Sequence, residues 1–106
     1  MQVKDADFDE KVVEQSKKKV VVADFWAAWC MPCQMLSPLL DKIVKSYDGK
    51  VVLAKINVDD NPEKSDEYGI DALPGVKIFK DGKVVKEFTG VIPEDKIREL
   101  IDKALK

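Results

Sequence analysis

The sequence has no histidine, only two cysteines and a single arginine, Arg98, among its 106 residues. Tetrahedral zinc takes four ligands, so this chain could complete a zinc site only with carboxylates or with a second subunit. Its 18 basic side chains are balanced by 20 acidic ones, which leaves a formal net charge of -2. Neither a metal site nor the continuous cationic face that binds nucleic acid is therefore expected.

Long apolar segments are also missing. The longest covers residues 20–23 and 25–29 and is interrupted by Asp24. It falls well short of the roughly 20 residues that span a bilayer. The N-terminal residues 1–7 lack the basic, apolar and small-residue order of a signal peptide. We therefore expect a cytoplasmic, monomeric chain with no membrane segment, folded as one domain over residues 1–106.

The spacing of apolar residues predicts alternating helices and strands. Residues 20–26 are apolar on both faces, which indicates a central strand covered on both sides. Asp81-Gly82 suits a tight turn between antiparallel strands, because both residues tolerate positive φ. The expected order is a helix over 8–15, a strand over 20–26, a helix that starts after Trp26 and stops before Gly49, a strand over 51–58, a short helix that Asn61 caps and Gly69 ends, strands over 76–80 and 83–88, and a helix from Pro93 onward.

This order joins a β-α-β half to a β-β-α half. Apolar faces on both kinds of element must be buried against one another, which favours layered packing. The chain shows no internal repeat and no low-complexity linker that would divide it. The predicted fold class is therefore α/β, with a central mixed β-sheet flanked by helices on both faces.

The two cysteines stand together in Cys30-Met31-Pro32-Cys33, where the first strand gives way to a helix. They could be half of a metal site, a structural disulfide, two buried thiols or a redox-active dithiol. A disulfide across so short a loop would contribute only about 2 kcal/mol in the chain-entropy model. Their position between strand and helix favours the redox-active dithiol.

Cys30 precedes the first helical turn, where free N–H groups and the helix dipole stabilise a thiolate. Pro32 fits that turn because its missing donor would be unpaired there in any case. Cys33 follows one turn after Cys30, so the two sulfurs can meet. Attack by Cys30 on a substrate disulfide would give a mixed disulfide, which Cys33 would resolve by attacking Cys30. The two electrons would move without a cofactor.

Asp24 is a carboxylate within an apolar strand. It could mark a strand end near water or a hydrogen-bonded structural group. It could also be a proton acceptor for Cys33, because burial raises the pKa of a carboxyl group. Lys55 lies in the next predicted strand, where its ammonium group could offset the burial of Asp24 or simply reach water.

Further segments resemble the thioredoxin family, and the resemblance covers essentially the whole chain. The matching segments are Asp24-Phe25-Trp26-Ala27, Trp29-Cys30-Met31-Pro32-Cys33, Pro38, Ala54-Lys55, Asn61-Pro62, Tyr68-Gly69-Ile70, Leu73-Pro74, Phe79-Lys80-Asp81-Gly82 and Gly90. The resemblance implies a thioredoxin fold and a cofactor-free reductase of protein disulfides. Its partners would be disulfide-containing protein substrates and a thioredoxin reductase that recharges it.

The same resemblance implies roles for particular residues. Asp24 and Lys55 would handle the proton of the exchange. Pro74 would form a cis peptide bond that faces the dithiol, and Leu73 would offer backbone groups to an extended substrate segment. Simple alternatives remain, since Trp29 could be a core aromatic, Pro74 a turn proline and Gly90 a bulge. The residues expected to contact substrate are Trp29, Met31, Pro32, Leu73, Pro74, Gly75, Gly90 and Val91.

Two residues depart from the family pattern. Met31 stands where glycine is usual, and its flexible apolar side chain could alter partner contact and the dithiol-disulfide balance. Gly75 stands where threonine is usual and would leave room for a close approach. The alternatives left open are a disulfide oxidant or isomerase of the same fold, and a non-catalytic module that binds partners around Trp29, Leu73 and Pro74.

Overall fold

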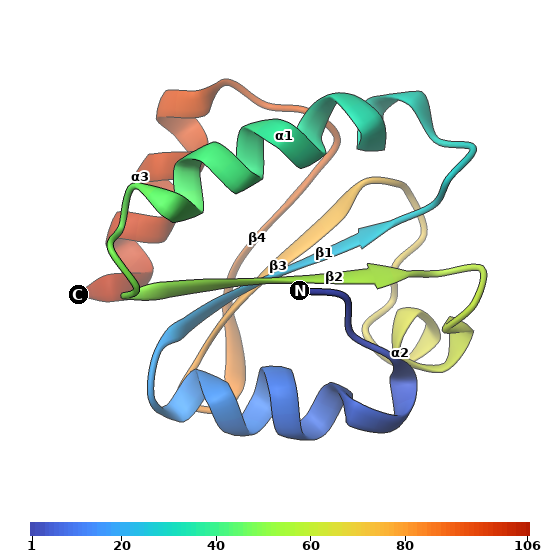
Figure 1. The fold of residues 1–106 in the computed structure, drawn as a ribbon, viewed down its shortest axis with the longest axis horizontal. Coiled ribbons are helices and arrows are strands. Elements are labelled where there is room, and N and C mark those ends of the chain that lie inside the picture. The colour runs from blue at the N-terminus through green and yellow to red at the C-terminus, as the bar shows by residue number, and fades with distance from the viewer.

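A four-stranded mixed sheet forms the centre of the molecule, with its strands in the order β2-β1-β3-β4 (Figure 1). The computed structural model covers residues 1–106. Strand β1 (Val20–Trp26) runs parallel to β2 (Val51–Asn57) and antiparallel to β3 (Gly75–Lys80). Strand β3 in turn pairs antiparallel with β4 (Lys83–Thr89). The prediction of a central first strand is confirmed, because β1 has a neighbour on each side.

Helices cover both faces of this sheet. Helices α1 (Met31–Lys45) and α3 (Glu94–Leu105) lie on one face, and α2 (Pro62–Glu67) and the N-terminal helical segment lie on the other (Figure 1). Each face has its own apolar core, one around Leu36 and Ile97 and one around Phe8 and Phe25. The predicted α/β fold class is confirmed. None of the helices combines the length and the apolar character needed to cross a membrane.

The N-terminal segment differs from the regular helix predicted over residues 8–15. It consists of a 3-10 turn η1 (Asp5–Asp7), a π-helical segment η2 (Asp9–Glu14) and a second 3-10 turn η3 (Gln15–Lys17). Phe8, Val12 and Ser16 are buried at four-residue intervals. The four-residue spacing places these side chains on the side of the segment that faces the sheet, as the predicted helix would also have placed them.

The sheet has a tight turn between β3 and β4 and a covered outer edge at β2. Asp81 and Gly82 adopt φ values of 54° and 84°, which confirms the predicted tight turn between β3 and β4. The outer edge of β2 is covered by the N-terminus, where Val3 N–H donates to the Lys55 carbonyl oxygen at 2.8 Å and Lys55 N–H donates to the Met1 carbonyl oxygen at 2.8 Å. This pairing protects an edge that would otherwise expose unpaired backbone groups.

Helix α2 is capped by a residue that the sequence did not indicate. Asn61 was expected to cap it, but its side chain makes no cap hydrogen bond. Instead the Asp5 carboxylate accepts hydrogen bonds from the backbone N–H groups of Glu63 at 3.1 Å and Lys64 at 3.0 Å. The Asn61 side-chain oxygen meanwhile accepts from Asp5 N–H at 3.0 Å. The cap therefore ties the N-terminal segment to α2.

We expect Asp5→Ala to lower the free energy of unfolding by about 0.5–2 kcal/mol, the usual contribution of a helix cap. The loss should be measured by urea denaturation at neutral pH. Asp66→Ala is the matched control, because it removes an exposed carboxylate from α2 without removing a cap. Equal stabilities of the two variants would contradict the assignment of Asp5 as the cap.

Candidate functional site

The two cysteines lie at the start of α1 and form a disulfide. Their Cα atoms are 5.3 Å apart, within the usual range for this bond. Cys30 is the N-cap residue of α1 in an extended conformation, and Cys33 lies in the first turn. Cys30 is 5% exposed and Cys33 is 2% exposed, so Cys30 is the more accessible of the two sulfur-bearing residues.

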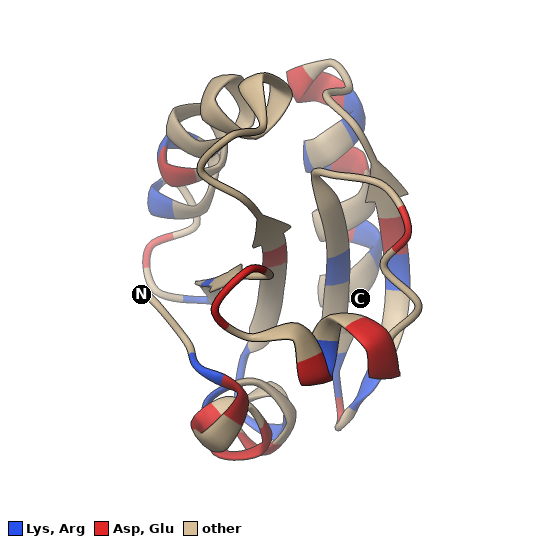
Figure 2. Ribbon diagram, turned by 90° about the vertical axis from the view of Figure 1, so that its right-hand side faces the viewer, with Lys and Arg blue, Asp and Glu red and all other residues tan.

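The helix terminus polarises the Cys30 sulfur. The Cys33 backbone N–H donates to Cys30 Sγ at 3.2 Å, and Pro32 occupies the first turn as expected. Residues 31–40 contain no charged side chain, so the first turns of α1 are tan in Figure 2. Within α1, the stabilisation available to a Cys30 thiolate therefore comes from the N–H groups and dipole of the helix rather than from a lysine or arginine of its first turns.

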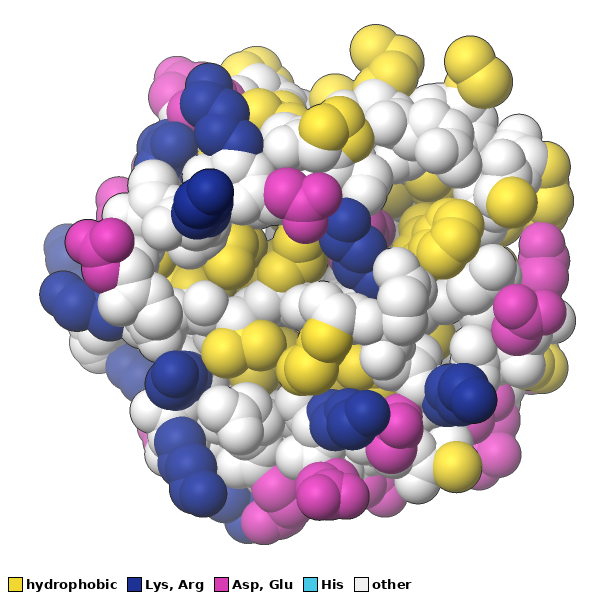
Figure 3. All heavy atoms as spheres, viewed as in Figure 1, with side chains coloured by type: hydrophobic (Ala, Val, Ile, Leu, Met, Phe, Trp, Pro, Cys, Tyr) yellow, Lys and Arg dark blue, Asp and Glu magenta, His cyan; other side chains and the backbone are white.

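Exposed apolar side chains surround this helix terminus. Trp29 is 70% exposed, Met31 71% and Met35 65%. Apolar side chains project over the N-terminal end of α1 at the upper right of Figure 3. Met35 was not among the residues expected from the sequence, although its spacing of four residues from Met31 places both on one side of the helix. The arrangement provides an apolar surface beside the disulfide.

The Trp29 side chain is held by a residue from another element. Its Nε1 donates to Asp59 Oδ2 at 2.8 Å, and Asp59 follows β2. This hydrogen bond fixes an exposed ring that would otherwise be free to change its rotamer. Asp59 was also missed from the sequence, since a residue 30 positions away gives no local signal of the contact.

The loop before β3 faces the cysteines. The Leu73–Pro74 peptide bond is cis, and Leu73 packs against the cluster of Ala27, Cys30 and Cys33. Gly90 joins this loop, because its N–H donates to the Pro74 carbonyl oxygen at 2.8 Å. Its neighbour Val91 is 44% exposed. The structure thus brings Leu73, Pro74 and Gly90 together near the disulfide.

Gly75 is buried, and the space beside it is occupied. A Cβ atom placed there would lie 3.2 Å from the Ala72 carbonyl oxygen and 3.2 Å from two side-chain carbons of Ile70. The missing side chain of Gly75 thus permits a close approach by Ile70, and contact of Gly75 with substrate stays a prediction. Ile70 fills that space, and the glycine accommodates the Ile70 side chain.

Asp24 lies on the face of β1 that α1 covers. Val20 and Val22 pack with α1 residues, and Asp24 continues the same alternation. The residue is 1% exposed, and its Oδ1 has no hydrogen-bond partner in the protein. Burial raises the pKa of Asp24 to about 7, while the charge of Lys55 opposes the shift and that of Asp41 adds to it. The group can therefore change protonation state near neutral pH.

Lys55 is the register partner of Asp24 on β2, but its ammonium group binds α1 instead. Its Nζ donates to Ser37 Oγ at 2.6 Å and lies 3.1 Å from the Asp41 carboxylate. The expected compensation for the burial of Asp24 is thus not a direct ion pair. Lys55 acts on Asp24 only through its longer-range electrostatic field.

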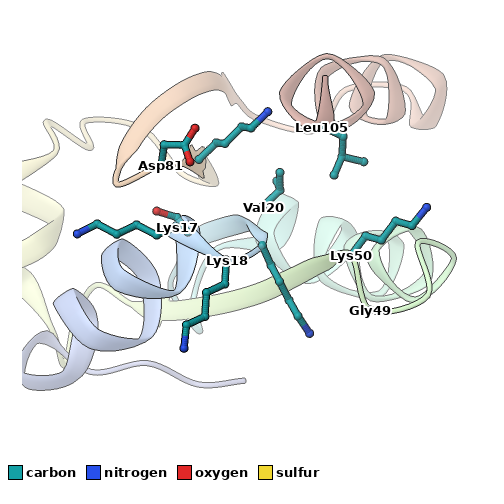
Figure 4. A pocket seen from close by; sticks show the side chains of 10 residues that line it. Lys17, Lys18, Val20, Gly49, Lys50, Asp81 and Leu105 are labelled. Carbon is teal, nitrogen blue, oxygen red and sulfur yellow. The ribbon is translucent and has the colours of Figure 1, made fainter.

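A hollow lies at the opposite end of β1 from the cysteines. Its volume is about 450 Å³, and lysines from three parts of the chain line it, among them Lys17, Lys50 and Lys80. In Figure 4 the ammonium groups of Lys17, Lys18 and Lys50 point away from one another. These ammonium groups do not converge on one point, so they do not form a binding site for a single anion. The candidate functional site is therefore the end of the molecule that carries Cys30 and Cys33.

Comparisons with known proteins agree with this geometry. The thioredoxin family model matches residues 1–103. A thioredoxin of Chlorobaculum thiosulfatiphilum is 41% identical over 98 residues, which cover 92% of this chain and 89% of the relative. A thioredoxin of Staphylococcus aureus is 39% identical over 105 residues, which cover 99% and 97% of the two chains. The chain therefore belongs to the thioredoxin family, and its Cys30–Cys33 pair is the redox centre of a thiol-disulfide oxidoreductase of the disulfide-reducing type.

Proposed function

We propose that Cys30 is the attacking thiolate and Cys33 the resolving thiol in the reduction of protein disulfides. The observation that carries this assignment is the position of Cys30 as the N-cap of α1, with its sulfur accepting the Cys33 N–H. Cys30 bonds to one substrate sulfur and displaces the other as a thiolate. Cys33, once deprotonated, attacks Cys30 and releases the reduced substrate, leaving the intramolecular disulfide.

Asp24 is the proposed acceptor of the Cys33 proton. Its buried carboxyl group has a pKa of about 7, which suits proton transfer at neutral pH. Lys55 contributes by favouring the ionised carboxylate through its field. The sulfur pair carries both electrons of the exchange, so the proposed reaction uses no cofactor.

The proposed substrate surface combines exposed apolar side chains and backbone. Trp29, Met31 and Pro32 surround Cys30 and are exposed. Pro74 and Gly75 are buried, so they act by shaping the loop, while Leu73 lies outside the strands and offers its backbone to an extended substrate segment. Gly90 borders this loop through its hydrogen bond to the Pro74 carbonyl oxygen, and the exposed Val91 follows it in the chain.

The partner that recharges the oxidised protein is proposed to be a thioredoxin reductase in the cytoplasm, and the working form to be a monomer. An equilibrium redox titration with alkylation of free thiols tests the direction of the chemistry. A Cys30–Cys33 couple more reducing than the glutathione pool supports the proposal. A couple well above that pool would assign the protein to disulfide oxidation or isomerisation instead.

We expect Asp59→Ala to raise KM for a disulfide-containing protein about two- to tenfold with little change in kcat. The variant loses one hydrogen bond that orders Trp29, which corresponds to about 0.5–1.5 kcal/mol. Steady-state kinetics across substrate concentrations measure the effect. Asp60→Ala removes the adjacent exposed carboxylate and is the control. A matching rise of KM in Asp60→Ala would assign the effect to general charge rather than to Trp29.

A further inference from the structure

A small cavity separates the first turns of α1 from the edge of the sheet. Its volume is about 130 Å³, enough for a few water molecules. Cys33 borders it from α1 and Lys55 borders it from β2. The remaining lining residues are Gln2, Trp26, Gln34 and Ser37. Polar groups from the helix and from the sheet therefore meet next to the resolving cysteine.

The side of α1 that faces Lys55 carries three polar residues, one on each successive turn. Cys33, Ser37 and Asp41 are spaced by four residues, which aligns them along one side of a helix. Ser37 and Asp41 both bind the Lys55 ammonium group, at 2.6 Å and 3.1 Å. The Lys55 side chain is 15% exposed, whereas that of Asp41 is 60% exposed. Lys55 is thus held between a half-buried hydroxyl group and a carboxylate at the surface.

The same contacts leave Asp24 without a bonded cation. Asp24 and Lys55 are register partners on adjacent parallel strands, so their side chains emerge on the same face of the sheet. No ion pair forms between them, and Asp24 Oδ1 remains without a partner. On the other side, the register partner of Asp24 on β3 is the apolar Val76. Lys55 is the cation whose charge lowers the pKa of Asp24, and α1 holds its ammonium group elsewhere.

We propose that Ser37 and Asp41 are positioning residues that clamp the Lys55 ammonium group to α1 and so prevent it from pairing with the Asp24 carboxylate. The clamp keeps the proton acceptor free of a fixed counter-ion, so that Asp24 can exchange its proton during each cycle. This inference rests on the proposed role of Asp24 in accepting the Cys33 proton.

The charges on the two sides of the clamp act in opposite directions on Asp24. Burial is the largest cause of its raised pKa, Lys55 lowers that pKa and Asp41 raises it. Cys33, the remaining ionisable residue on this side of α1, is held in the disulfide of the oxidised protein and does not titrate. Releasing the clamp should therefore move the Asp24 titration in one direction, toward lower pH.

The test is a pH titration of the Asp24 carboxyl carbon by NMR in the oxidised protein, comparing Ser37→Ala and Asp41→Asn with the unaltered chain. Asp41→Asn removes the Asp41 charge together with one of the two contacts to Lys55, so we expect the proton affinity of Asp24 to fall about tenfold. Ser37→Ala removes one of the two contacts and should give a smaller fall. Ser37→Thr keeps the hydroxyl group and should restore the original titration.

Asp48→Asn is the matched charge control, since Asp48 is exposed in the turn at the far end of α1. Loss of the Asp41 charge by itself lowers the Asp24 midpoint, so Ser37→Ala is the deciding variant. An unchanged or higher midpoint in Ser37→Ala, or an equal fall in Asp48→Asn and Asp41→Asn, overturns the clamp. Resolution of a mixed disulfide by Cys33, followed against pH, separates this inference from the proposed function. A shifted Asp24 midpoint supports the clamp, and the absence of a matching shift in the resolution profile would then remove Asp24 from proton transfer.

Discussion

Cys30→Ser is expected to reduce disulfide reductase activity to the rate of the uncatalysed reaction with the same external dithiol. The serine hydroxyl is not ionised by a helix terminus at neutral pH and cannot form the mixed disulfide. Cys33 lies inside the first turn of α1 and lacks the N-cap position that stabilises a Cys30 thiolate, so it does not replace Cys30. Reduction of a protein disulfide under saturating external dithiol measures the loss.

Cys33→Ser is expected to keep the first step and lose the second. Cys30 still attacks, but the mixed disulfide has no neighbouring thiol to resolve it, so one substrate molecule remains bound per protein. Mass spectrometry without reductant detects this adduct. The double variant with both cysteines replaced is the control and should trap nothing. A Cys30→Ser variant that trapped substrate through Cys33 would reverse the two assigned roles.

The double variant also tests the reading of the chain as a binding module. Such a module would keep its biological effect without either sulfur, because partners would bind around Trp29, Leu73 and Pro74. A redox enzyme loses that effect together with the dithiol. If the variant without either cysteine kept the biological effect, that effect would come from partner binding and not from the thiol-disulfide exchange typical of the thioredoxin family.

The parts of the fold that follow from local pattern were predictable. The apolar stretch at residues 20–26 required a strand with neighbours on both sides, and β1 has them. Asp81-Gly82 supplied the positive φ values of a tight turn. The position of Cys30 before a helix also followed from sequence, because the strand and helix patterns change between Trp26 and Cys33. In each case, neighbouring residues determine the outcome.

The contacts that could not be predicted join residues far apart in the chain. Asp5 caps a helix across 58 positions, and Trp29 binds Asp59 across 30. Lys55 pairs with α1 rather than with its register partner Asp24, because the side of α1 that meets β2 carries Ser37 and Asp41. Such pairings depend on how the helices and strands pack together. The sequence contains many other polar residues that could equally well have been the hydrogen-bond partners of Trp29, Lys55 or the start of α2.

The second large effect is expected from Asp24→Asn and concerns stability. An unperturbed aspartate has a pKa near 3.9, whereas burial raises that of Asp24 to about 7 in the folded chain. Well below pH 4 the group is protonated in both states and has no effect on the pH dependence of folding. Between about pH 4 and pH 7 the unfolded chain has released this proton and the folded chain still retains it, so the folded protein loses stability across this interval. Above about pH 7 the folded chain ionises as well and the loss ends.

The size of this loss follows from the proton affinities. Each tenfold difference in proton affinity between the folded and unfolded chains corresponds to about 1.4 kcal/mol. The two pKa values of Asp24, near 3.9 and about 7, differ by about three units, so the ionised Asp24 destabilises the fold by about 4 kcal/mol above pH 7 relative to pH 4. We expect the free energy of unfolding of Asp24→Asn to increase relative to the unaltered chain by up to that amount between pH 4 and pH 8. Urea denaturation at each pH measures it, and the comparison cancels any constant contribution of the buried amide.

The same substitution should impair the exchange. The resolving step needs a group that accepts the Cys33 proton, and removal of such a base slows a reaction by about tenfold or more. Stopped-flow measurement of mixed-disulfide resolution should show that the rise in rate centred near pH 7 is lost in Asp24→Asn. Asp48→Asn removes an exposed carboxylate and should leave both profiles unchanged. Greater stability at high pH with unchanged resolution would show that the buried carboxyl group destabilises the fold without serving the reaction, whereas both changes together would explain why a destabilising carboxylate occupies the central strand.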